Sequence, residues 1–127
     1  MSFTNFLETE ILDHVFAGAA YSAPATKYLA LFTAISDGEA GSVTELSGDA
    51  YARQSVAFST SGATTSNTGA VEFPTATGSW GTVTHVGVYD AVSSGNLMCY
   101  ATLSSSKAIG TGDVFRVPVG DLDITLN

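Results

Sequence analysis

The stretch WGTVTHVGVYDAVSSGNLMCYATL, residues 80–103, decides the fold class. It contains two runs in which apolar and small polar residues alternate, the pattern of β-strands. Between them, DAVSSGN (90–96) is rich in Asp, Ser, Gly and Asn, which allow a chain to reverse direction. The stretch therefore predicts a β-hairpin. It also holds the only tryptophan, the only cysteine and one of the two histidines, so it is the first candidate for a catalytic site.

Strand alternation separates the chemical groups of this hairpin. Successive side chains of a strand point to opposite faces, so His85 and Asp90 are expected on opposite sides of the sheet. The first strand would place on one face Val83, His85, Gly87 and Tyr89. The return strand would present a core face made of Leu97, Cys99, Ala101 and Leu103. Cys99 is then a small buried hydrophobe, and neither pair, His85–Cys99 or His85–Asp90, is expected to catalyse a reaction.

No other motif predicts an enzyme, a cofactor or a metal site. Two histidines, His14 and His85, with one cysteine do not supply the ligand number and spacing of a zinc site. The oxygens of DAVSSGN could hold a calcium ion, but their spacing differs from that of a calcium-binding loop. GTGD (110–113) lacks the lysine and the helix of a phosphate loop. We therefore expect no catalytic, cofactor-binding or metal-binding residues.

Upstream of the hairpin, SFTNFLETEILDHVFAG (2–18) is the one clear helix. Its apolar stripe, at four-residue spacing, consists of Phe3, Leu7, Ile11 and Val15. Ser2 or Thr4 would cap the start of the helix, and Gly18 would end it. We expect the helix to cover one side or one end of a sheet.

The rest of the chain predicts short strands. Residues 27–34 (KYLALFTA) are apolar on both faces, which indicates a central strand covered twice. Residues 36–50 hold three glycines and four acids, and we expect an exposed loop there. Further strands are expected at 51–59, near 71–73 and at 122–126. Together these elements predict one mainly β domain over 1–127, with a helix in 1–18 and a β core in 21–127. Its fold is expected to be an antiparallel β-sandwich or barrel of about six to eight short strands.

Charge and composition narrow the function classes. The net charge is −8, from twelve acidic and four basic residues, and 13% of all residues are charged. Negative charge repels phosphate backbones, so no nucleic acid is expected as a partner. No apolar run approaches the ~20 residues of a membrane helix, and a single cysteine fits a reducing compartment. A surface of small neutral side chains suits packing against other subunits, and it equally suits a monomeric β-domain with a Ser/Thr-rich exterior.

Several segments together resemble a known family. In chain order they are LETEILDHVF, PATKYLALFTA, TELSGDAYARQSVAF, NTGAVEFPTATGSWGTVTHVGVYDA, GNLMCYATL and GDLDITLN. The most specific pieces are YARQ, VEFPTATGSWGTVTHVGVYD and GNL. Over nearly its whole length the chain resembles a group of small tailed-bacteriophage virion proteins that are often labelled tail fibre or minor structural proteins. The resemblance implies a structural protein of the virion, made in the cytoplasm of a bacterial host.

Within that group, we expect capsid decoration (cement) first. Host-binding fibres are typically long, with trimeric shafts and repeats, whereas this chain is short, acidic and poor in charge. Decoration proteins are small β-rich knobs on the outside of the shell, often trimers, so the expected partners are the major capsid protein and further copies of the chain at the capsid surface. Intersubunit contacts are expected from the helix residues Phe3, Phe6 and Leu7, and from the loop residues Glu39, Val43 and Leu46.

A tail component is the alternative: an adaptor, a tip or a small fibre subunit. In that role Trp80 and Tyr51 would stack on host glycans, the usual use of exposed aromatic rings beside hydrogen-bonding groups. A hydrolase that acts on the cell envelope is a third hypothesis. The lack of paired carboxylates and of metal ligands in the sequence argues against it.

Overall fold

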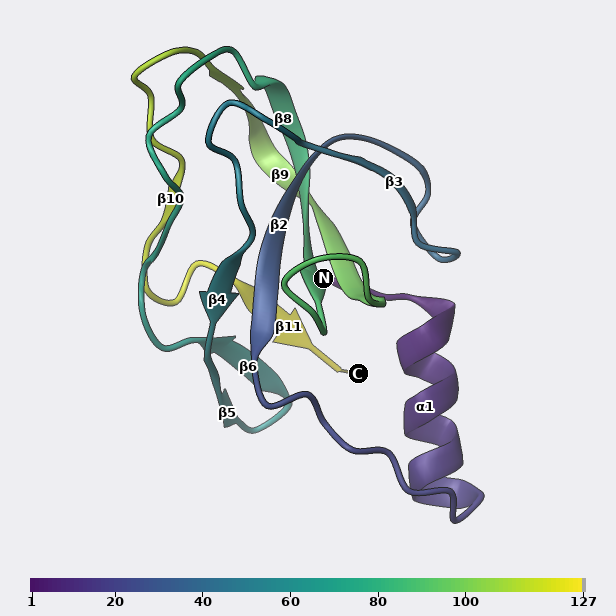
Figure 1. Ribbon diagram of the computed structural model, residues 1–127. Helices are drawn as coiled ribbons and strands as arrows, with labels where there is room; N and C mark the ends of the chain where they lie inside the picture. The colour runs from purple at the N-terminus through teal and green to yellow at the C-terminus, as the bar shows by residue number, and fades with distance from the viewer. Residues whose placement is uncertain (127) are drawn as a thin grey trace.

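A computed structural model describes residues 1–126, which form a mainly β fold with one N-terminal helix (Figure 1). The helix is α1 (Asn5–Phe16). The strands of the described residues are β1 (Ser2–Phe3), β2 (Lys27–Asp37), β3 (Ser42–Glu45), β4 (Gln54–Val56), β5 (Phe58–Ser61), β6 (Thr64–Asn67), β7 (Val71–Glu72), β8 (Gly81–Tyr89), β9 (Leu97–Ile109), β10 (Arg116–Val117) and β11 (Asp123–Thr125). The predicted fold class is confirmed. The described residues form eleven strands, more than the six to eight expected, and several of these strands are only two to four residues long.

All strand pairs are antiparallel and fall into three sheets. The main sheet has the order β1-β9-β8-β2-β3, with β4 also paired to β2. Two small sheets, β11-β6-β5 and β10-β7, complete the fold, and the sheets do not close into a barrel (Figure 1). The predicted hairpin is therefore β8–β9, at the centre of the main sheet.

Strand β2 is the centre of the core. Its residues Leu29, Ala30, Leu31 and Phe32 have no exposed surface at all, which confirms the prediction of a strand covered on both faces. The larger apolar cluster lies on the Leu29 and Leu31 face, toward the small sheets. The smaller cluster lies on the opposite face and consists of Ala30, Phe32, Tyr89 and Leu97.

Two irregularities in the β8–β9 ladder correct the predicted alternation. Val88 pairs with Cys99 but Tyr89 pairs with Leu97, so Met98 is an extra residue on β9. This bulge turns Leu97 into the smaller cluster, away from Cys99, so the expected shared core face of Leu97 and Cys99 is wrong. The ladder is irregular a second time between Val83 and His85. Val83 therefore packs in the larger cluster and does not share a face with Tyr89.

Helix α1 is shorter than the predicted 2–18, and Thr4, one of the two predicted caps, is its N-cap. The Thr4 hydroxyl accepts a hydrogen bond from the N–H of Leu7 and donates one to the carbonyl of Leu97, at 2.6 Å. Phe3 belongs to β1, so it is not part of the helical stripe. The helix ends at Phe16, and Gly18 follows in the left-handed conformation at φ 73°, as predicted.

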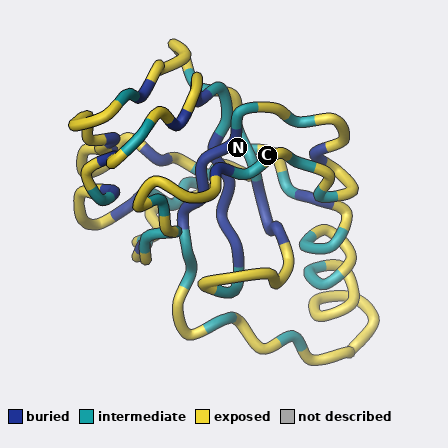
Figure 2. Tube along the Cα trace, turned by 45° about the horizontal axis from the view of Figure 1, so that its top comes forward, coloured by how far each residue is buried: buried dark blue, intermediate teal, exposed yellow. Residues whose placement is uncertain are grey.

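Helix α1 projects beside the main sheet and does not lie flat on it (Figure 1). None of its residues is fully buried. Figure 2 shows exposed positions along most of the helix, whereas the buried segments gather in the strands. The helix is therefore attached mainly at its N-terminal end, where Thr4 bonds to β9.

The segment 36–50 is more ordered than the predicted exposed loop. It contains β3, which pairs with the end of β2. Leu46 is 9% exposed and belongs to the larger cluster, and its N–H donates to the carbonyl of Leu31. Exposed positions remain in the turns on either side of β3 and at alternate residues of β3 itself, Ser42 and Thr44.

Candidate functional site

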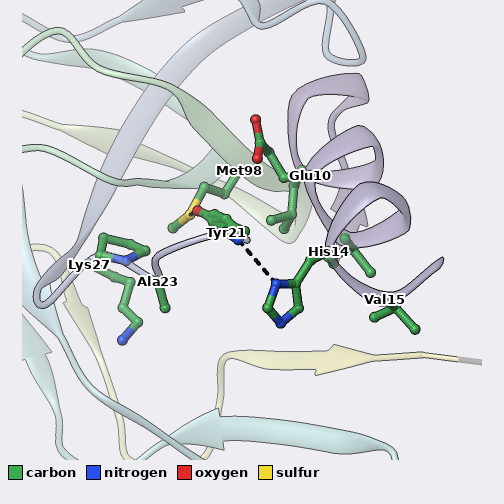
Figure 3. Close-up of a pocket in the computed structure, with 10 residues that line it drawn as sticks. Glu10, His14, Val15, Tyr21, Ala23, Lys27 and Met98 are labelled. Atoms are coloured by element: carbon green, nitrogen blue, oxygen red, sulfur yellow. Dashed lines mark hydrogen bonds between the residues drawn. The ribbon is translucent and has the colours of Figure 1, made fainter. Parts of the chain in front are cut away.

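A groove runs between α1 and the segment that leads from it to β2. We call it the α1 groove; it has a volume of about 370 Å³. The residues that line it are Leu7, Glu10, Ile11, His14, Val15, Tyr21, Ala23, Pro24, Lys27 and Met98. Figure 3 shows the helix along one side of the groove and the Tyr21–Lys27 segment along the other. Most of these side chains are apolar, so the groove is suited to apolar groups of a partner.

A second apolar hollow adjoins the α1 groove. It has a volume of about 310 Å³ and shares Leu7, Lys27 and Met98 with the groove. Its further lining comes from β1, β5, β6, β8, β9 and β11: Phe3, Phe58, Thr60, Thr65, Val88, Cys99 and Ile124. Apolar surface therefore continues from α1 toward the β11-β6-β5 sheet.

Local hydrogen bonds hold the α1 groove in shape. The N–H of Tyr21 donates to Nδ1 of His14 at 3.0 Å, which fastens the returning chain to the last turn of α1 (Figure 3). The Tyr21 ring packs edge-on against Phe6. Burial raises the pKa of Tyr21, and the negative charges of Asp90 and Glu10 raise it further. Tyr21 is therefore a neutral wall of the groove.

Lys27 is the positive charge of the groove. Figure 3 shows its side chain extending away from Glu10. The ion pairs among residues 1–126 are Arg53–Glu45 and Arg116–Glu72, so no described carboxylate of the same chain pairs with Lys27. The groove thus combines apolar walls with a cation that lacks an internal partner in the part of the chain that is described.

The residues expected to make intersubunit contacts lie in different environments. Phe3, Phe6 and Leu7 are half-buried and pack against the larger cluster, so each offers only part of its side chain. Glu39 is exposed and accepts a hydrogen bond from the Tyr100 hydroxyl at 2.6 Å. Val43 packs against the smaller cluster. Leu46 is 9% exposed and belongs to the larger cluster, so its side chain has little surface for a partner.

The hairpin does not assemble a catalytic group. Cys99 pairs with Val88 on the larger-cluster face, whereas His85 pairs with Phe32 of the opposite face. Burial raises the pKa of the Cys99 thiol to about 12, so it is not a ready nucleophile. The Asp90 carboxylate accepts hydrogen bonds from the backbone and side-chain N–H groups of Asn96 and closes the 90–96 turn. Within residues 1–126 no group of three His, Cys, Asp or Glu side chains is arranged to hold a metal ion.

Trp80 is buried in the core, and Tyr51 is half-buried and packs against it. Trp80 is 5% exposed, and its Nε1–H donates to the carbonyl of Asp49 at 2.9 Å. Tyr51 stacks on Phe73 and meets Trp80 edge-on. Trp80 therefore belongs to the core at the start of β8, and its burial argues against a role for its ring in stacking on a glycan.

The YARQ motif builds an ion-pair network that sequence patterns did not reveal. Arg53 pairs with Glu45 at 2.8 Å, lies 3.6 Å over the centre of the Tyr89 ring and donates to the carbonyls of Ala91 and Ser94. The Tyr51 hydroxyl donates to the same Glu45 carboxylate at 2.6 Å. One signal in the sequence could have indicated this network: Arg53 is a charged residue in a segment expected to form a strand, and a charge that becomes buried needs a partner of opposite charge. The network fixes the 90–96 turn to β3.

The sequence model of one protein family, described as Podophage GP4 fiber I protein gp80, matches residues 2–125. The chain belongs to this family. Membership confirms the resemblance to structural proteins of tailed-phage virions, and it covers both α1 and the β core. No curated protein matches the chain.

Family membership bears on the two expected roles differently. The family description names a fibre, so it favours a tail component over capsid decoration. Within the described residues no helix has the length and apolar character that crossing a membrane requires. The protein is a virion structural protein, and the α1 groove is an open hollow with mostly apolar walls on its surface.

Proposed function

We propose that the protein is a structural subunit of the phage tail apparatus, a fibre or fibre-attached component, and that it catalyses no reaction. The observation that carries this proposal is the match to a fibre family over residues 2–125, almost the whole chain. The α1 groove fits a subunit of any assembly, because such a subunit needs surface that its own core leaves uncovered; only the family description favours the tail. Capsid decoration has no comparable support.

Particles that lack this protein test its position. A phage with the gene deleted is expected to form intact, DNA-filled heads, to lose density at the tail and to adsorb poorly to its host. Supplying the purified protein to such particles should restore the tail density. Loss of density from the outer shell of the head, with unchanged tails, would overturn the proposal and return the protein to the capsid surface.

The environments of the candidate chemical groups support a role without catalysis. His85 and Cys99 face opposite sides of the main sheet, and the Asp90 carboxylate is engaged by Asn96. Purified protein is therefore expected to release no fragments from host cell-wall or capsular polysaccharide. Release that is lost in the His85→Ala or Asp90→Ala variant, with the fold retained, would contradict this part of the proposal.

A further inference from the structure

The outer face of α1, on the side of the helix away from the α1 groove, carries two exposed apolar side chains. Leu12 is 57% exposed and Phe16 is 81% exposed. They follow the groove residue Leu7 by five and nine positions, which turns them by about 140° and 180° from it. The two residues are four positions apart, so they are neighbours along one side of the helix. We call this pair the outer ridge.

The described part of the chain leaves the outer ridge uncovered. Figure 1 shows α1 standing beside the main sheet, and none of the residues of the helix is fully buried. Figure 2 shows exposed positions along most of the helix. Large apolar side chains that lie next to each other within a polar border mark a contact surface, whereas isolated ones do not. The outer ridge therefore indicates a partner.

Two carboxylates border the outer ridge. Glu8 precedes Leu12 by four positions and Asp13 precedes Phe16 by three, spacings at which the side chains of a helix are neighbours. Both acids are exposed, and the ion pairs found within residues 1–126 include neither of them. The sequence of α1 contains no lysine or arginine. The border of the ridge is therefore negative.

The position of Asp13 is unfavourable for the helix itself. Asp13 lies in the last turn of α1, where the partial negative charge of the helix C-terminus repels a carboxylate. Its backbone carbonyl, not its side chain, accepts the hydrogen bonds from the N–H groups of Ala17 and Ala19. A cation that approaches this end of the helix from outside the chain would offset the repulsion.

We propose that the outer ridge binds a different protein of the virion, at an apolar pocket with lysine or arginine side chains at its rim. Leu12 and Phe16 enter the pocket, and Glu8 and Asp13 pair with the rim. The inference rests on the proposed function only for the place of the partner, which is a neighbouring component of the tail. The net charge of −8 favours the same kind of partner, because a basic surface attracts this chain over a distance and an acidic one repels it.

The apolar and the acidic groups have different tasks in this contact. Large side chains that lose all contact with water at the centre of an interface carry most of its binding energy. Phe16, the most exposed of the large apolar residues, is the first anchor, and Leu12 is the second. Carboxylates at the border stay close to water, so they mainly speed association and select the partner. Salt should therefore weaken the contribution of Glu8 and Asp13 and leave that of the ridge unchanged.

Binding of purified protein to phage particles that lack it measures this contact. Phe16→Ser is expected to raise the Kd about 30-fold or more, and Leu12→Ser about 10-fold or more. The double variant Glu8→Gln, Asp13→Asn should slow association several-fold at about 50 mM salt and have little effect at about 500 mM. All four side chains point into solvent in the isolated chain, so circular dichroism melts should show a retained fold.

Two variants outside α1 are the matched controls for these measurements. Val119→Ser removes an apolar side chain that is 60% exposed, and Glu72→Gln removes a carboxylate whose side chain is 63% exposed. Both controls should bind like the unchanged protein. Equal effects of ridge and control variants would overturn the proposal, and so would a double variant whose slower association persists at high salt.

Photo-cross-linking on assembled particles identifies the partner. Phe16→p-benzoyl-phenylalanine keeps an aromatic group on the ridge and should cross-link to a virion protein of different sequence, at a segment with lysine or arginine beside apolar residues. Val119→p-benzoyl-phenylalanine should give little of that product. A product with a second copy of this chain, a cross-linked segment without basic residues, or equal yields from the two positions would each overturn the proposal.

These outcomes are distinct from those that test the proposed function. Protein that returns to the tail, with ridge variants that bind as tightly as the unchanged chain, would refute the outer-ridge contact alone. Protein that returns to the capsid shell, with binding lost in Phe16→Ser, would refute the tail role alone.

Discussion

Replacing Glu45 by glutamine is predicted to destabilise the protein through Arg53. The Arg53 side chain is 7% exposed and the Glu45 side chain 23% exposed, so the pair is largely shielded from water. Glutamine keeps the shape of Glu45 but removes its charge, which leaves the guanidinium with the Tyr89 ring and the carbonyls of Ala91 and Ser94.

The expected cost follows from this partial shielding. Removing one partner of a fully buried ion pair costs about 3–5 kcal/mol. Here Glu45 is partly exposed, and glutamine can still accept from Tyr51, so we expect a loss of about 2 kcal/mol in the free energy of unfolding. For a domain of this size, that corresponds to a fall in Tm of about 6–10 °C.

Thermal and urea unfolding would measure this loss, with Glu72→Gln as the matched control. Glu72 pairs with Arg116 at 3.8 Å, and both side chains are more than half exposed, so that variant should be close to neutral. Hydrogen exchange should also rise in the 90–96 turn of Glu45→Gln. If Glu45→Gln proved no more destabilising than Glu72→Gln, the network would be a surface ion pair and the reasoning would be refuted.

Three further predictions concern the main sheet. Gly87→Ala should lower the free energy of unfolding by about 1–3 kcal/mol in a urea melt, because a Cβ would lie 2.7 Å from the side chains of Phe32 and Leu97; a neutral result would contradict this tight packing. Thr4→Val should cost about 1–2 kcal/mol in the same melt through loss of the cap and of the bond to Leu97, whereas Thr4→Ser should be nearly neutral. Cys99 should react with a thiol reagent at pH 8 only in denaturant, and fast labelling of the folded protein would contradict its burial. Burial raises the pKa of Cys99 from 9.0 to about 12, so its contribution to stability is complete below pH 9 and is lost as the pH rises toward 12; circular dichroism during an alkaline titration would follow this loss.

Much of the β architecture could be predicted from local patterns. The apolar run of 27–34 predicts β2, because a strand that is buried on both faces is apolar at successive positions. The alternation in 80–103 predicts the β8–β9 hairpin, because a strand that is buried on one face alternates between apolar and polar residues. The bulge at Met98 produces no such pattern. A single inserted residue reverses the face of Leu97 and places it with Tyr89 in the cluster of Phe32, a contact between segments far apart in the sequence.

The candidate site was predictable only in part. The apolar stripe of α1 pointed to Leu7 as a contact residue, and Leu7 lines the groove. The groove itself depends on how far α1 stands from the sheet, and that distance is set by the bonds of Thr4 to β9 and of Tyr21 to His14. The side chains of Leu12 and Phe16, 57% and 81% exposed, lie outside the four-residue stripe, so periodicity alone assigned them no role.

The double burial of β2 has a consequence for synthesis in the host cell. Residues 27–37 leave the ribosome about 50 residues before their neighbour β8 is complete at Tyr89. At translation rates of about 5–20 residues per second, the strand waits some 3–10 seconds for the surface that covers it. During that time KYLALFTAI is an uncovered apolar segment with strong β preference, the kind of segment that promotes aggregation. Folding must therefore wait until most of the chain has been made, and the yield of this protein in a foreign host should improve with slower growth or with added chaperone.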